Sequence, residues 1–252
     1  MRLFAFEGIR YTPVAGDVAE LASLPSDQIN DALRIRYHVK SPQQFTQLTR
    51  PVAAPGGNPF QNAADLHRQW LEEGVVKRDE RPAVYPYVID LASGGQRLGV
   101  FALVDLDGAG EAAPESLPAD RVALLEEARA DLEPVFLLAE DGGRLDELVR
   151  QDAAQGEALV RHEDPDENLH TLYKVDDPAR IALYKEAAAG PVKVASGQSF
   201  YQVARHFAAK NQAEPGTAAA AKLAVVTSAT GAKVQPPVAS GLVWADHASR
   251  IL

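Results

Sequence analysis

The segment 192–204 joins a strand pattern to a helix pattern through a single glycine. Residues 192–196 favour a short strand, Gly197 favours a turn, and the residues from Gln198 onward favour a helix. Backbone N–H groups in the first turn of such a helix can bind an anion, and the helix dipole adds positive character there. The same spacing also describes a plain strand-to-helix connection without a ligand, which is the commoner case.

Strand and helix patterns alternate along the rest of the chain. Residues 83–91 and 98–106 favour two strands joined by a hairpin turn at 93–96. Asn58 and Pro59 have the residue types of a helix cap and a first helical residue. The alternation predicts an α/β or mixed α+β fold, and 252 residues allow one large domain or two small ones.

Composition excludes several classes of function. The formal net charge of -10 disfavours a nucleic-acid partner, because the phosphate backbone requires a basic face. The chain has no cysteine, which excludes disulfides, thiolate metal sites and a cysteine nucleophile. It has no apolar run of about 18 residues, so we expect no membrane span. Its first residues, MRLFAFE, do not resemble a signal peptide, and we expect a cytoplasmic protein.

Two charged residues near the start are candidate site residues. Arg10 comes just before a turn that Pro13 and Gly16 favour, and it is either a solvated edge residue or a ligand for an anion. Asp27 is either the cap of a helix that begins near Gln28 or a functional carboxylate, as a general base or a metal bridge.

Residues 8–13 read GIRYTP, and residues 195–201 read ASGQSFY. These segments resemble the domain of unknown function 1015 family, which is grouped with the ParB/sulfiredoxin fold. The family reads G-[LI]-R-Y-N-P at the first segment and A-D-G-H-H-R-Y at the second. Gly197 and Tyr201 match, whereas Ser196, Gln198, Ser199 and Phe200 replace an acid, two histidines and an arginine. The resemblance extends from Gly8 to about Leu242, and typical members continue for another domain's length.

The resemblance implies a fold. It predicts a single family domain over 1–252 with a ParB/sulfiredoxin-like core. That core would be formed by 1–57 and 176–252, and 58–175 would be an inserted α/β subdomain.

The resemblance also implies a site, because relatives in the fold group include kinases that phosphorylate free serine with a nucleotide. Asp27 would be the base. Residues 110–113 and 118–121 are similar to the family's H-E-x-T and K-x-D-R, so Glu111 or Asp120 would hold magnesium. Asp120 and Arg121 are otherwise an acid and an exposed arginine in the first turn of a helix over 119–133. The residues expected to bind phosphate or ligand are Arg10, Ser196, Gly197, Gln198, Ser199, Tyr201, Asp120 and Arg121.

The expected function depends on the loss of the family's acid, histidines and arginine from residues 196–200. Loss of one cationic stabiliser of phosphoryl transfer can cost about a thousandfold in rate, and several are missing here. We therefore expect a weakly active or non-catalytic relative that binds ATP or ADP with magnesium, or a phosphometabolite, and that has no metal site of its own. The alternatives are an active kinase for free serine or a similar hydroxyl, and a structural or protein-interaction role. The partner expected is a small phosphate-bearing ligand, with no nucleic acid and no membrane; the oligomeric state stays open.

Overall fold

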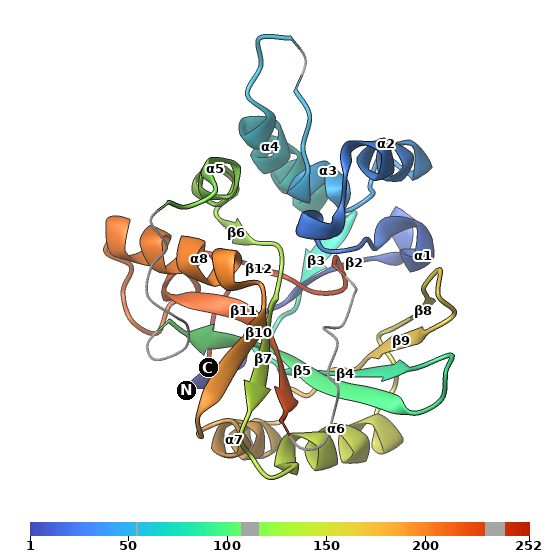
Figure 1. The fold of residues 1–252 in the computed structure, drawn as a ribbon, viewed down its shortest axis with the longest axis vertical. Helices are drawn as coiled ribbons and strands as arrows, with labels where there is room; N and C mark the ends of the chain where they lie inside the picture. Colours follow the sequence, from blue (N-terminus) through green and yellow to red (C-terminus); the bar gives the residue numbers. More distant parts are fainter. Residues whose placement is uncertain (54, 107–115, 230–239) are drawn as a thin grey trace.

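A mixed sheet of eight strands forms the centre of the protein in a computed structural model that describes residues 1–53, 55–106, 116–229 and 240–252 (Figure 1). The strands of this sheet are β1 (Leu3–Phe4), β4 (Tyr85–Asp90), β5 (Gln96–Asp105), β7 (Val135–Ala139), β8 (Val160–Glu163), β9 (Leu169–Leu172), β10 (Val192–Ser196) and β11 (Ala221–Ser228).

The order across the sheet is β10-β7-β11-β5-β4-β9-β8, with β1 paired to β5. β7 and β11 are parallel, and the other pairs are antiparallel. Two short pairs lie outside the sheet: β2 (Ile9–Tyr11) with β3 (Val76–Arg78), and β6 (Ala130–Asp131) with β12 (Ala245–Asp246).

Helices lie on both sides of the sheet (Figure 1). They are α1 (Val18–Leu21), α2 (Asp31–Lys40), α3 (Thr46–Thr49), α4 (Pro59–Glu72), α5 (Ala119–Ala128), α6 (Arg144–Gln155), α7 (Pro178–Ala187) and α8 (Gln198–Lys210), with 3-10 turns η1 (Pro13–Ala15), η2 (Ser26–Gln28) and η3 (Ala218–Ala220). None of these helices is long and apolar enough to cross a membrane in the part of the chain that the structure describes.

The two faces of the sheet bury separate apolar clusters. Along β5, Phe101 and Leu103 point to one face, whereas Val100, Ala102 and Val104 point to the other. The first cluster includes the tryptophan of α4 and Trp244 near the C-terminus, and the second includes the inner faces of α6, α7 and α8. A sheet buried on both faces explains why β11 has no exposed residue.

The mixed α/β fold is confirmed. The ParB/sulfiredoxin-like core and the division at residues 58 and 175 stay predictions. β1, β10 and β11 come from the predicted core and the other strands of the large sheet from the predicted insertion, so strands of both parts lie side by side in one sheet.

The helix that was expected near Gln28 starts later and has another cap. Asp27 lies within η2, and its side chain caps no helix. The cap of α2 is Asn30, whose side-chain oxygen accepts a hydrogen bond from the backbone N–H of Leu33. The prediction that Asp27 is a helix cap is therefore wrong. Asn is as good a cap as Asp, and here it stands one residue before the helix.

Candidate functional site

The junction between β10 and α8 has the strand–glycine–helix form that the sequence predicts. Gly197 has φ of 84°, in the left-handed region. A Cβ atom at this position would lie 3.2 Å from the Cα atom of Val135 in β7. Backbone conformation and packing against β7 therefore both require glycine. No side chain caps the helix, so its first-turn N–H groups stay available to another acceptor.

A narrow crevice lies beside this junction. It has a volume of about 30 Å³, and Asp27, Ser196, Gly197 and Phe200 are among its lining residues. The structure thus brings the predicted base next to the predicted phosphate-binding turn. This volume holds about one water molecule, so the crevice itself is too small for a nucleotide.

Arg121 connects α5 to the first turn of α8. Its Nη1 atom donates a hydrogen bond to Oγ of Ser199. Its guanidinium carbon lies 3.9 Å from the centre of the Phe200 ring, in cation–π contact. Two residues predicted to bind ligand, Arg121 and Ser199, are therefore in direct contact, although they lie 78 positions apart in the chain.

A larger pocket of about 430 Å³ adjoins Arg121. Three arginines line it: Arg34 of α2, Arg50 at the end of α3, and Arg121. Its apolar wall includes Val52 and Phe60. We call it the arginine pocket.

Two of the arginines of this pocket, Arg34 and Arg50, form only long ion pairs with the described residues. Oδ1 of Asp31 lies 3.5 Å from Nε of Arg34 and 3.6 Å from Nη2 of Arg50, and the Asp31 side chain is 79% exposed. Long ion pairs that involve an exposed carboxylate contribute little free energy. The positive charge of Arg34 and Arg50 is therefore available to an anion at little cost.

Thr49 adds a polar group to the wall of the arginine pocket. The residue is only 5% exposed, and its Oγ1 atom has no hydrogen-bond partner among the described residues. A buried hydroxyl without a partner costs free energy, which a hydrogen bond to a group that reached it would recover.

The side chain of Glu133 is buried and contacts Ser26 of η2, which lines the arginine pocket. Glu133 accepts hydrogen bonds from the backbone N–H of Ser26, at 2.6 Å, and from its hydroxyl, at 2.5 Å. Burial raises the pKa of Glu133, and the hydrogen bonds from Ser26 and the positive charge of Arg121 oppose that rise. Glu133 thereby fixes the position of Ser26.

Arg10 forms an ion pair with Asp79. Its Nη2 atom lies 2.6 Å from Oδ1 of Asp79, and Tyr85 donates a further hydrogen bond to Asp79 at 2.7 Å. Burial alone would raise the pKa of Asp79, but the bonds from Arg10 and Tyr85 lower it below its ordinary value. Arg10 lines neither the crevice nor the arginine pocket.

The remaining predicted residues are dispersed. Asp120 is exposed and lines the arginine pocket. Tyr201 is fully buried, and its hydroxyl donates to the backbone oxygen of Asp105 at 3.4 Å. Nε2 of Gln198 is buried and has no hydrogen-bond partner in the described part of the chain. Glu111 lies outside the described residues. No group of three or more His, Asp or Glu side chains that could hold a metal occurs among the described residues.

Sequence reasoning missed Arg34, Thr49 and Arg50. No motif marks these residues, because α2 and α3 approach Arg121 of α5 only in the folded chain, where α4 packs against both α3 and α5.

Comparison with known proteins gives one match. The model of a family described as "Protein of unknown function (DUF1015)" matches residues 3–231. No curated protein and no solved structure matches the chain.

Proposed function

The chain belongs to the DUF1015 family of proteins of unknown function, and we propose that it binds a small phosphate-bearing molecule in the arginine pocket with little or no turnover. The observation that carries this proposal is the convergence of Arg34, Arg50 and Arg121 beside the unpartnered hydroxyl of Thr49. Such a cluster is notable in a chain with a net charge of -10, because it concentrates positive charge at one place.

The chemistry of the lining favours phosphate over a single carboxylate. Guanidinium groups present paired N–H donors whose spacing matches that of two phosphate oxygens. Each N–H donor forms a charge-assisted hydrogen bond with its phosphate oxygen. The three arginines outnumber the two acids of the pocket, Asp31 and Asp120. The volume of about 430 Å³ is within the range of small-molecule sites. Val52 and Phe60 offer apolar surface to the rest of the ligand.

Arg121 also explains how the site relates to the family motif. The resemblance places an arginine where this chain has Phe200, and here the guanidinium of Arg121 lies over that ring. An anion bound to Arg121 would lie close to the first turn of α8, where the helix dipole favours negative charge. A side chain from α5 would thus supply a cation that the motif of α8 has lost.

Catalysis is the alternative proposal. Phosphoryl transfer to free serine or a similar hydroxyl would use Asp27 as the base and Asp120 with magnesium. Asp27 lines the crevice and Asp120 lines the arginine pocket, so neither pocket contains both. A structural or protein-interaction role is the second alternative, and it requires neither pocket.

A ligand panel separates these functions. Thermal unfolding of the full chain would be followed with inorganic phosphate, ATP, ADP, O-phosphoserine and serine, each with and without magnesium. The proposal predicts a rise of a few degrees in Tm with phosphate-bearing compounds and none with serine. Release of ADP from ATP in the presence of serine would instead support the kinase. A Tm that no compound changes would contradict ligand binding and favour the interaction role.

A further inference from the structure

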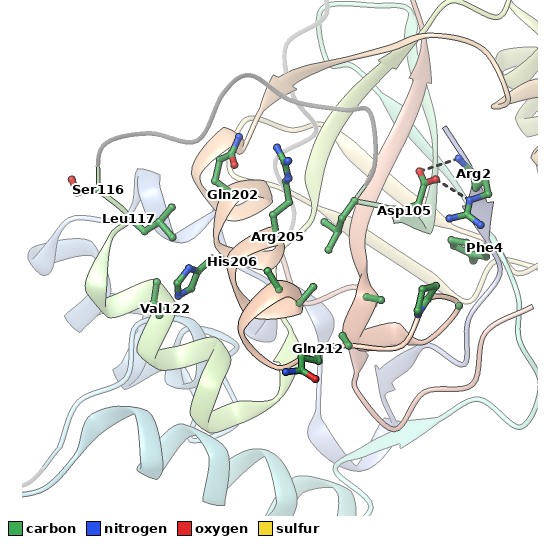
Figure 2. Close-up of a pocket in the computed structure, with 17 residues that line it drawn as sticks. Arg2, Phe4, Asp105, Ser116, Leu117, Val122, Gln202, Arg205, His206 and Gln212 are labelled. Carbon is green, nitrogen blue, oxygen red and sulfur yellow. Dashed lines mark hydrogen bonds and ion pairs between the residues drawn. The ribbon is translucent and has the colours of Figure 1, made fainter.

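A second and larger cavity lies along α8, apart from the arginine pocket. It has a volume of about 910 Å³, which is sufficient for a ligand of ordinary small-molecule size. Its described lining comes from α8 and the chain that follows it, from the start of α5, and from the edge formed by β1 and the end of β5. It shares no lining residue with the arginine pocket. Figure 2 shows the side chains that surround it.

One face of α8 lines the cavity with an arginine and with small side chains. Gln202, Arg205, Ala208 and Ala209 all line it. Arg205 lies three residues after Gln202, and Ala208 and Ala209 lie three and four residues after Arg205, so the four share a face of the helix. The two alanines leave room that larger side chains would fill. Arg205 is exposed, lines the cavity, and projects from α8 beside Gln202 (Figure 2). No hydrogen bond or ion pair engages Arg205 within the described ranges.

Asp105, which also lines the cavity, forms an ion pair with Arg2. Oδ2 of Asp105 accepts a hydrogen bond from Nε of Arg2 at 3.0 Å, and Oδ1 accepts one from the backbone N–H of Arg2 at 3.0 Å (Figure 2). Asp105 therefore offers little repulsion to an anion that approaches Arg205. Besides Arg2, the arginine among the described lining residues is Arg205.

The rest of the lining is mainly apolar. It includes Phe4, Leu106, Ala213 and Ala220 beside the alanines of α8. On the other side of the helix, His206 faces Leu117 and Val122 (Figure 2). An apolar wall with one available cation is complementary to a molecule that has an apolar body and a single anionic head.

We propose that this cavity is a second ligand site, which takes a small amphipathic carboxylate whose head group binds Arg205 and whose apolar body lies against Ala208 and Ala209. The site is independent of the proposed phosphate site, because it uses none of the three arginines there.

The test uses three probes with the same apolar chain, octanoate, octanol and octylamine, titrated by calorimetry into the full-length protein. The proposal predicts saturable binding of octanoate and at least tenfold weaker binding of octanol and octylamine, because a charge-assisted hydrogen bond is then absent. Equal affinity for the three probes would overturn the assignment of Arg205, and the absence of saturable octanoate binding would overturn the site.

Two variants locate the binding. Arg205→Gln is expected to weaken octanoate binding at least tenfold, and Ala209→Trp to abolish it by filling the cavity. Both positions are exposed on α8, so the fold should tolerate the changes. The matched control is Arg161→Gln, which removes the same charge from an exposed position of β8 that lines neither cavity. Unchanged octanoate affinity in Arg205→Gln and Ala209→Trp would show that the probe binds elsewhere and would overturn the proposal.

Discussion

The guanidinium of Arg121 donates a hydrogen bond to the hydroxyl of Ser199 and so joins α5 to the first turn of α8. The same group packs on the Phe200 ring at 3.9 Å. One side chain thus makes both contacts between the arginine pocket and the turn that carries the family motif. Its role in stability can be separated from its proposed role in binding.

Replacement of Arg121 should cost more stability than replacement of its acceptor. Arg121→Ala removes a charge-assisted hydrogen bond and a cation–π contact, and we expect the free energy of unfolding to fall by about 2 kcal/mol. Ser199→Ala removes the hydrogen bond but keeps the ring contact, so we expect a loss of about 1 kcal/mol. Urea denaturation measures both values. Equal losses would show that the contact with Phe200 contributes nothing.

The glycine at the β10–α8 junction gives a prediction with a built-in control. Gly197 and Gly216 both have φ of 84°, but an added Cβ would meet the backbone of Val135 only at Gly197, whereas nothing lies within 4 Å at Gly216. Gly216→Ala should therefore cost about 1 kcal/mol for the left-handed conformation alone. Gly197→Ala should cost about 2–3 kcal/mol in the same urea assay. An equal loss of stability in the two variants would mean that β7 shifts to make room for the extra methyl group.

Gly197→Ala also tests where an anion binds. The arginine pocket does not include Gly197, so the folded variant should keep the response of Tm to phosphate. Loss of that response in a protein that remains folded would place the anion at the N-terminus of α8 instead.

His67 should make the stability depend on pH. It is 4% exposed, and its Nε2 atom accepts a hydrogen bond from Nε1 of Trp244 at 3.1 Å. Burial lowers the pKa of His67 in the folded protein. The unfolded chain takes up a proton near the ordinary value of about 6.5, and the folded protein does so only at lower pH. The stability that His67 contributes is therefore complete above about pH 6.5 and is lost as the pH falls towards the folded pKa.

A variant isolates this contribution from the other titrating groups. His67→Gln keeps a possible acceptor for Trp244 but does not titrate. The stability advantage of the natural protein over His67→Gln should shrink between about pH 7.5 and about pH 5.5, by at most about 1.4 kcal/mol per pH unit. A constant advantage across this range, measured by urea denaturation, would contradict the assignment of a neutral buried imidazole.

Local signals in the sequence predicted the starts of several elements. Asn58 caps α4 by accepting hydrogen bonds from the backbone N–H groups of Phe60 and Gln61. The β4–β5 hairpin and the turn at Gly197 occur as predicted, although β5 begins at Gln96, the last residue of the predicted hairpin turn. Caps and tight turns depend on neighbouring residues, so a single sequence contains their cause.

Features that depend on distant residues were not predictable. The helix expected over 119–133 ends at Ala128, because Arg129 adopts a left-handed conformation and the next residues pair with β12. The arginine pocket is formed by residues of α2, α3, α4 and α5, whose arrangement in space no local pattern encodes. Resemblance identified Arg121 and Ser199 singly, but their contact with each other is a property of the folded chain.

The most direct test of the central claim is a calorimetric titration of inorganic phosphate into the natural protein, Arg50→Gln and the control Arg161→Gln. Arg50 lines the arginine pocket, and its ion pair with Asp31 is long, so its replacement should leave the fold intact. The claim predicts saturable binding to the natural protein and to the control, and at least tenfold weaker binding to Arg50→Gln. Equal affinity of all three proteins for phosphate, or no saturable binding to any of them, would contradict it.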